Sequence, residues 1–264
     1  MNRRKLLTST LAASALAGPG ALRSLSAPQG ETSSREYYEL RFYHLRRGPQ
    51  TKIMDEFLEN VAIPAWNRLG IGPVGVFRVT VGPQNPSVYV LLPSKSLETL
   101  VSAGTRLAAS GEMAKAGAFW DAPAASPAYV RRESSLMIAF ETFPKLEVPA
   151  GAAEKRPRIF ELRTYESHSK KENLKKIGMF NHGEIAIFRR TGLRAVFFGE
   201  SLIGSRLPNL TYLLVFDDLA ARERVWSAFG ADPEWKTMSA NPDYAETVSN
   251  ITNVLLSPAP YSQI

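Results

Sequence analysis

The chain has 264 residues, of which 44% are hydrophobic and 22% are charged, and its formal net charge at pH 7 is +7. This is an ordinary globular composition, sufficient for one large domain or two small ones. The sequence contains no cysteine, which excludes disulfides, thiolate metal sites, cysteine nucleophiles and lipid attachment through cysteine.

The first residues have the pattern of an export signal. Arg3, Arg4 and Lys5 precede a short apolar stretch that is followed by Gly-Pro-Gly at 18–20, and this stretch is too short to span a bilayer. The paired arginines followed by two leucines predict the bacterial twin-arginine route, with an ordinary secretory signal as the alternative. We therefore expect residues 1–27 to be an export signal, residues 28–36 to be a flexible lead-in, and the protein to be periplasmic or extracellular.

The predicted signal also explains the basic charge of the chain. It carries four basic residues and no acid, and subtracting these four charges from +7 leaves the remainder near +3. No stripe of Lys and Arg with interleaved aromatic residues remains, so we expect no nucleic-acid partner. We also expect no membrane span in the mature protein.

The next part of the chain predicts a series of strands and helices. The range 37–43 alternates and is rich in aromatic residues, as in a strand, and 49–69 has helical spacing, with Pro64 expected to kink or break the last turn. The further elements predicted here are strands over 74–81 and 88–92, a helix over 94–109 with Leu97, Val101 and Leu107 on its buried side, a short helix over 112–120 and a strand over 135–143.

The second half of the chain repeats this order. A strand over 159–165 is followed by a helix over 170–191 that Gly192 ends. The elements predicted after it are strands over 194–201 and 210–216, a helix capped by Asp217 or Asp218, short helical turns over 233–239 and 242–245, and a strand over 248–257.

Matching residues occur at a constant offset of 122 positions. Tyr38-Glu39-Leu40-Arg41-Phe42-Tyr43 corresponds to Phe160-Glu161-Leu162-Arg163-Thr164-Tyr165, and Gly70 corresponds to Gly192. A repeat of this kind indicates tandem duplication, here of a ferredoxin-like βαββαβ unit over 37–143 and 159–264, joined by a linker over 144–158. Because each unit leaves one sheet face bare, we expect the fold class α+β, with the two units forming an intramolecular dimeric α+β barrel with helices outside.

Alternation along the doubled strand separates its residues into two faces. Tyr38, Leu40 and Phe42 share one face, which we expect to meet the helices because it is apolar. The residues on the opposite face are then expected in the barrel interior as a polar network, either as structural ion pairs or as a ligand site; they are Glu39, Arg41, Tyr43, Glu161, Arg163 and Tyr165.

Several segments together resemble the NIPSNAP family, and in particular exported bacterial members with two such domains. They are the aromatic-ELR-x-Y strand, MFNHGEIAIFRRTGL, FFGESLIGSRLPNLTYLLVFDD, the DPEW turn and the ending SNITNVLLSPAPYSQI. The resemblance covers about 37–264 and is weaker in the first unit, where VAIPAW replaces the N-x-G-E-I run. It implies the dimeric α+β barrel fold, and it implies no established activity.

The segment MFNHGEIAIFRR supplies two further candidates, His182 and Glu184. On a regular helix they point to different sides, so only an interruption at Gly183 would bring both to the barrel mouth, with His182 as a base. The alternative is that His182 is a surface residue. The three histidines have no metal-site spacing, so we expect no metal; we also expect no cofactor, with haem bound through His182 as a remote alternative by fold analogy.

Two functions fit these observations. The first is a small-ligand-binding or interaction protein without catalysis, which is the interpretation we favour. The alternative is a small-molecule enzyme of the barrel superfamily, monooxygenase-like or isomerase-like, that uses a polar barrel interior. A homo-oligomer is a possible further partner, and the sequence identifies neither ligand nor reaction.

Overall fold

A computed structural model describes residues 35–82 and 84–264 of the chain. The predicted export signal and most of the predicted lead-in lie outside these described residues. One helix–strand unit follows another along the chain, as the sequence predicts.

The first unit contains four strands and a set of helical segments. Its elements are β1 (Tyr37–His44), α1 (Pro49–Phe57), η1 (Leu58–Ala62), α2 (Ile63–Arg68), β2 (Gly75–Val81), β3 (Ser87–Ser94), α3 (Leu97–Ala109), η2 (Glu112–Phe119) and β4 (Arg131–Ala139). The last strand is predicted four residues too late, and the cap of α3 is Ser96, whose hydroxyl accepts a hydrogen bond from the Thr99 N–H at 3.1 Å.

The second unit repeats the order and ends with shorter helices. Its elements are β5 (Ile159–Glu166), α4 (Lys170–Met179), η3 (Phe180–Glu184), α5 (Ile185–Thr191), β6 (Arg194–Ile203), β7 (Asn209–Phe216), α6 (Leu219–Ala231), α7 (Pro233–Ser239), η4 (Pro242–Tyr244) and β8 (Asn250–Pro258). Gly192 ends α5 in the left-handed region (φ 88°), and Asp218 caps α6, both as predicted.

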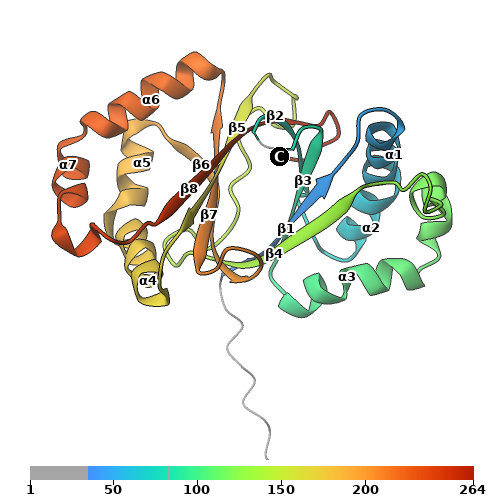
Figure 1. Cartoon of the computed structure of the whole chain (residues 1–264). Helices are drawn as coiled ribbons and strands as arrows, with labels where there is room; N and C mark the ends of the chain where they lie inside the picture. The colour runs from blue at the N-terminus through green and yellow to red at the C-terminus, as the bar shows by residue number, and fades with distance from the viewer. Residues whose placement is uncertain (1–34, 83) are drawn as a thin grey trace, which may run out of the picture. The chain divides into compact units, whose positions relative to one another are not determined.

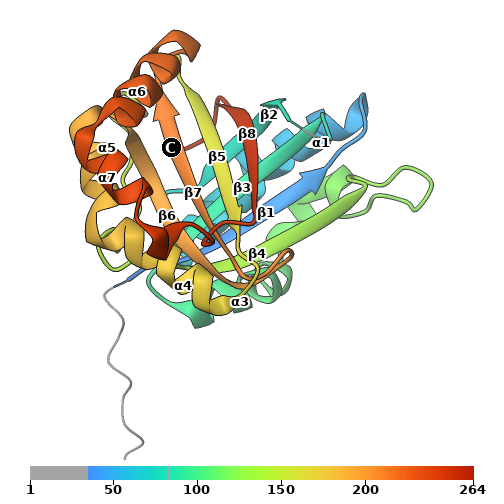
Figure 2. The ribbon, with the colours of Figure 1, turned by 60° about the vertical axis from the view of Figure 1, so that its left-hand side comes forward.

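The eight strands close into one barrel in the order β1-β3-β2-β8-β5-β7-β6-β4. Each unit contributes a four-stranded antiparallel sheet, and the sheets join where β2 pairs with β8 and β4 pairs with β6. Figure 1 shows the helices of the first unit on one side of the strands and those of the second unit on the other. Figure 2 shows the strands of both sheets between these two helical layers. The predicted intramolecular α+β barrel with helices outside is confirmed.

The duplication extends to the strand register. Leu40 of β1 lies opposite Leu91 of β3, and Leu162 of β5 lies opposite Leu213 of β7, which is the same pairing shifted by 122 residues. The helices α3 and α6 are also shifted by 122 residues over their full length. Positions of the two units can therefore be compared residue by residue.

Both long helices contain a π-helical turn at the same place, η1 in the first unit and η3 in the second. Pro64 does not break its helix, which continues through α2. The residue at the position of Pro64 in the second unit is Ala186, so the proline does not cause the turn. Single π turns inside α-helices are frequent at functional sites.

The prediction of which strand face points inward is wrong. The barrel interior is apolar and contains Tyr38, Phe160 and Leu162, with the rings of Phe77 and Phe160 4.8 Å apart across the sheets. The predicted polar residues Glu39, Arg41, Tyr43, Glu161, Arg163 and Tyr165 instead lie on the faces covered by the helices. The space between two sheets is closed to water on both sides, whereas helices leave gaps at which a charged side chain can be solvated or paired.

The buried side of α3 also differs from the prediction. Leu100, Ala103 and Leu107 are buried, whereas Val101 is 66% exposed and Leu97 is 37% exposed. The helix is thus rotated from the predicted position, and Val101 faces the edge of the helical layer. This rotation matters for the site described next.

Candidate functional site

Glu161 on β5 is the centre of a closed polar cluster in the second unit. It is fully buried and accepts four hydrogen bonds: one from Arg163 Nη1 at 2.7 Å, two from Arg222 at 2.7 and 2.9 Å, and one from the indole N–H of Trp226 at 2.9 Å. A carboxylate has about four acceptor positions, so Glu161 is saturated by side chains of its own unit. Arg222 and Trp226 come from α6, and their contact with Glu161 fixes this helix over the sheet.

The cluster keeps Glu161 ionised. Burial alone would raise the pKa of Glu161, but the hydrogen bonds from Arg222, Trp226 and Arg163 outweigh burial and hold the pKa below its ordinary value. The guanidinium of Arg163 also lies 4.8 Å from the centre of the Trp226 ring and donates to the hydroxyl of Tyr165 at 3.1 Å. The result is a desolvated network in which each charge has a partner.

Glu39 on β1 is the equivalent residue of the first unit, and its surroundings are more open. Arg41 donates to both carboxylate oxygens, at 2.8 and 2.7 Å, and the Ser134 hydroxyl donates to Oε1 at 2.6 Å. The side chain of Glu39 is 15% exposed, against 0% for Glu161. Arg41 itself is buried, with Trp66 of α2 as its aromatic partner at 5.0 Å.

Two substitutions between the copies explain this difference. Leu100 stands where Arg222 stands in the second unit, and Gly104 stands where Trp226 stands. Neither residue reaches Glu39 with a hydrogen-bond donor. Leu100 is buried, but a Cβ at Gly104 would meet no atom within 4 Å, so the place of the Trp226 ring is left open beside the Glu39–Arg41 pair.

An open cleft of about 480 Å³ lies in this free space. Its lining residues come from β1, α3, β4 and the end of β6: Glu39, Arg41, Leu100, Val101, Gly104, Thr105, Arg132, Ser134, Leu136 and Ile203. The volume falls in the range of small-molecule sites, and an apolar wall with a few convergent polar groups is the usual composition of such sites.

Glu39 at the floor of the cleft is kept ionised by its neighbours. Burial alone would raise the pKa of Glu39, but the hydrogen bonds and the charge of Arg41, with Ser134 and the charge of Arg132, keep it below its ordinary value. Glu39 therefore presents an ionised carboxylate, held by Arg41, to whatever enters the cleft.

The second unit also contains a buried ion pair at the π turn. Lys176 Nζ lies 2.7 Å from Glu184 Oε2, and the two side chains are 6% and 3% exposed. The ammonium group also lies 4.7 Å from the centre of the Phe180 ring. Burial raises the pKa of Glu184, although Lys176 acts in the opposite direction. The first unit has Met54 and Ala62 at these two positions, so the pair belongs to the second unit alone.

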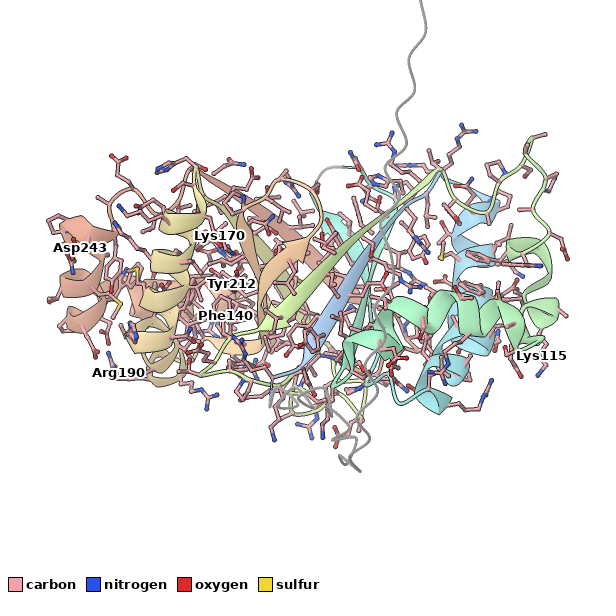
Figure 3. The ribbon with its side chains drawn as sticks, turned by 90° about the horizontal axis from the view of Figure 1, so that it is seen from below. Lys115, Phe140, Lys170, Arg190, Tyr212 and Asp243 are labelled. Atoms are coloured by element: carbon pink, nitrogen blue, oxygen red, sulfur yellow. The ribbon has the colours of Figure 1, made fainter. Side chains whose placement is uncertain are left out.

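This pair lies within the packed layer between the helices and the sheet. Tyr212 of β7 and Phe140, both labelled in Figure 3, lie in the same layer and are almost fully buried. The hydroxyls of Tyr212 and Tyr165 are 2.8 Å apart. Burial is also the main reason why the pKa of Tyr212 is raised well above its ordinary value.

The predicted pair His182 and Glu184 is not brought together for catalysis. His182 is exposed on the outer side of η3, whereas Glu184 is buried against Lys176. Gly183 does not interrupt the helix; a Cβ at this position would lie 2.3 Å from Met238 Cε, so the glycine allows α7 to pack closely. An exposed histidine on a helix surface does not fit a haem ligand, which needs a cavity wall that buries the porphyrin.

Within residues 35–82 and 84–264, no cluster of three or more His, Asp or Glu side chains has the arrangement of a metal site. Over the same ranges, no helix has the length and hydropathy needed to cross a membrane.

Other cavities differ from the cleft at Glu39 in size and lining. At one mouth of the barrel, Tyr89, Thr164 and Thr211 line a space of only about 60 Å³, which is small for anything larger than water. A shallow cleft of about 830 Å³ lies beside the end of the linker. There the buried Arg158 donates from its two Nη atoms to the main-chain oxygens of Arg156 at 2.9 Å and Ile264 at 2.8 Å, and its Nε has no hydrogen-bond partner among the described residues.

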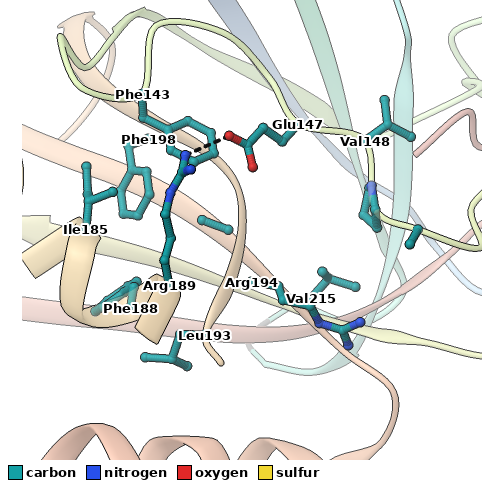
Figure 4. Close-up of a pocket in the computed structure, with 13 residues that line it drawn as sticks. Phe143, Glu147, Val148, Ile185, Phe188, Arg189, Leu193, Arg194, Phe198 and Val215 are labelled. Carbon is teal, nitrogen blue, oxygen red and sulfur yellow. Dashed lines mark hydrogen bonds and ion pairs between the residues drawn. The ribbon is translucent and has the colours of Figure 1, made fainter. Parts of the chain in front are cut away.

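A further cavity, of about 260 Å³, lies between the linker and α5 and is shown in Figure 4. Its walls are mainly apolar, with Phe143, Phe188 and Phe198 among them. Its visible ion pair, Arg189 with Glu147 at 2.8 Å, is solvent-exposed. It thus lacks a buried ion pair like that of Glu39 and Arg41.

The fold and the paired Glu–Arg strands define the class of this protein: a single-chain dimeric α+β barrel made of two βαββαβ units. The sequence profile of the NIPSNAP family matches residues 38–139 and 160–263. The chain therefore belongs to the NIPSNAP family, with two tandem copies of the family's domain. No curated protein matches the chain.

Several solved structures are similar to this chain. An uncharacterized NIPSNAP-like domain protein from Burkholderia xenovorans is 24% identical, with 40% of this chain and 90% of that chain covered and a TM-score of 0.37. A putative monooxygenase from Lactobacillus acidophilus covers 85% of this chain and 94% of its own, at 8% identity and a TM-score of 0.56. A putative monooxygenase from Fusobacterium nucleatum covers 85% and 92%, at 7% identity and a TM-score of 0.53. At their low identities, the two matches with TM-scores above 0.5 show the shared fold alone.

Proposed function

We propose that this NIPSNAP protein is an exported small-ligand-binding protein without catalytic activity, and that its ligand occupies the cleft above Glu39 and Arg41. The observation that supports this proposal most directly is the difference between the two units. The same Glu–Arg pair is sealed by Arg222 and Trp226 in the second unit, and it borders an open cleft in the first.

Comparison with the second unit explains why only the first unit is expected to have an open ligand site. Burying an ionised carboxylate is costly unless donors satisfy it, and the second unit provides them from α6. In the first unit α3 provides none, so part of Glu39 faces the cleft. A ligand that offers a donor and apolar surface would complete the cluster.

The enzymatic alternative remains a hypothesis without a placed set of reacting groups. It was based on a polar barrel interior, and the described interior is apolar. His182, its proposed base, lies on the surface. The export signal over residues 1–27 and a periplasmic or extracellular location remain predictions, as does the absence of a cofactor.

Native mass spectrometry of the full chain, purified from a bacterial host that exports it, tests the proposal. We expect a retained small molecule in the wild-type protein and its loss in Gly104→Trp, with Gly104→Ala as the matched control that keeps the cleft open. A ligand that survives Gly104→Trp would contradict the proposed site, and an absorption spectrum that shows a bound chromophore such as haem would contradict the predicted absence of a cofactor. The same spectra report whether the chain forms a homo-oligomer.

A further inference from the structure

The second unit shows which groups a Glu–Arg pair of this fold accepts. The indole of Trp226 donates its N–H to Glu161 Oε2 at 2.9 Å, while Arg163 lies 4.8 Å from the ring centre. The ring is thus held by a charge-assisted hydrogen bond and a cation–π contact. Arg222 adds the positive charge.

The positive charge of Arg222 has a counterpart in the first unit, whereas the indole ring of Trp226 has none. Arg132 of β4 lines the cleft and its charge acts on Glu39. In contrast, a Cβ built on Gly104 would meet no atom within 4 Å. The group missing from the first unit is therefore an aromatic ring with an N–H donor.

The carboxylate of Glu39 also has a free acceptor position for such a donor. Glu161 accepts four hydrogen bonds from side chains, whereas Glu39 accepts three, and only one of these reaches Oε2. Among the described residues, Oε2 of Glu39 accepts a hydrogen bond from Arg41 alone. It has an acceptor position left for a ligand.

The remaining walls select against charged ligands. Val101, Leu136 and Ile203 supply apolar surface to the cleft, which suits a flat hydrocarbon ring. Because Glu39, Arg41 and Arg132 present both signs of charge to the cleft, a cation is attracted by Glu39 but repelled by the two arginines, and an anion is attracted by the arginines but repelled by Glu39 at the position where the donor is needed. A neutral ring meets neither penalty.

We infer that the cleft above Glu39 binds a neutral aromatic heterocycle with an N–H donor, of which indole is the simplest example. Its ring lies where Trp226 lies in the second unit, and its N–H donates to Glu39 Oε2. This inference rests on the proposed function, because it names the ligand class of the same cleft.

Isothermal titration calorimetry of the full chain with indole, benzofuran and benzoate tests the inference. Benzofuran has the shape of indole without the N–H, and benzoate is a planar anion. Because benzofuran offers no N–H to Glu39 Oε2, we expect it to bind roughly tenfold more weakly than indole. Gly104→Ala should retain indole binding, and Gly104→Trp should abolish it because the new ring occupies the site.

A second variant tests the inference without relying on the first unit. Trp226→Gly opens the equivalent space over Glu161, so indole should raise the melting temperature of this variant more than benzofuran does. Equal effects of the two rings on both proteins, or tighter binding of benzoate, would overturn the inferred ligand class. Those results would leave the proposed function intact, since that proposal fails only if a retained ligand is unaffected by Gly104→Trp or if none is retained.

Discussion

The buried pair of Lys176 and Glu184 offers a sharp test of how the second unit is stabilised. The two side chains are 6% and 3% exposed and their charged atoms are 2.7 Å apart. Removing one partner of such a pair leaves an uncompensated buried charge, which costs about 3–5 kcal/mol. For a domain of this size, that loss lowers the melting temperature by about 6–20 °C. We therefore expect Lys176→Met and Glu184→Ala to be strongly destabilised as single variants.

The double variant has a different expected outcome, because the first unit has Met54 and Ala62 at these positions. Replacing a buried pair by apolar residues is often neutral, so Lys176→Met combined with Glu184→Ala should recover most of the stability lost in either single variant. The measurement is urea unfolding followed by circular dichroism for all four proteins. Single variants that each cost less than about 1 kcal/mol, or additive losses in the double variant, would refute the reasoning.

The pH dependence of Lys176→Met follows from the raised pKa of Glu184. In this variant the native state holds the Glu184 proton to higher pH than the unfolded state does. The contribution of Glu184 to stability is therefore fully present below the unfolded value of about 4.5 and is lost as pH rises through the higher folded value; it is measured as the difference in unfolding free energy between Lys176→Met and the double variant Lys176→Met, Glu184→Ala across pH. A difference that rises with pH over this window would contradict the assignment.

Three further changes have distinct expected effects. Gly183→Ala should change the free energy of unfolding by less than about 1 kcal/mol, because the only close contact of its Cβ, at 2.3 Å, would be with Met238 Cε, the end of a flexible side chain, and because alanine favours a helix over glycine. Thermal unfolding measures this change, and a loss of more than about 2 kcal/mol would show that Met238 cannot move aside. Trp226→Gly should cost about 2–4 kcal/mol in urea unfolding, from lost ring burial and a lost donor to Glu161, whereas a neutral effect would show that the indole does not seal the cluster. The folded-state pKa of Glu161 is lowered, so its contribution to the free energy of unfolding is present above about pH 4.5 and is lost as pH falls through the folded value. Glu161→Gln should remove this loss in acid from a profile of stability against pH. An unchanged profile would contradict the stabilising role of the ionised Glu161.

The fold could be predicted from the sequence because it depends on features that repeat. The two aromatic-ELR-x-Y strands, the paired glycines at 70 and 192 and the constant offset of 122 identify a duplicated βαββαβ unit. A single unit leaves one sheet face uncovered, and so the pairing of the two sheets followed from burial alone. The barrel order confirms it.

The orientation of the strand faces could not be predicted in the same way. Alternation separates Tyr38 and Leu40 from Glu39 and Arg41, but it does not say which set lies between the sheets. The prediction assumed that helices require the more apolar face. The structure shows that the closed space between two sheets requires it more strongly, whereas the helical side can hold charges that pair with Arg222 or face a gap.

Part of the site is visible in the sequence. Comparison at the offset of 122 shows Gly104 at the position of Trp226, and Met54 at the position of Lys176. These differences mark where the two units diverge in chemistry. Their meaning depends on the rotation of α3 and on the π turn before Glu184, which spacing alone does not reveal.

The most direct test of a ligand site above Glu39 is a crystal structure of the protein purified from its exporting host. We expect electron density for a small molecule between β1 and α3, within hydrogen-bond distance of Glu39 Oε2, and only Arg222 and Trp226 at the equivalent place over Glu161. A cleft at Glu39 that holds ordered water alone, with a ligand bound elsewhere in the barrel, would contradict it.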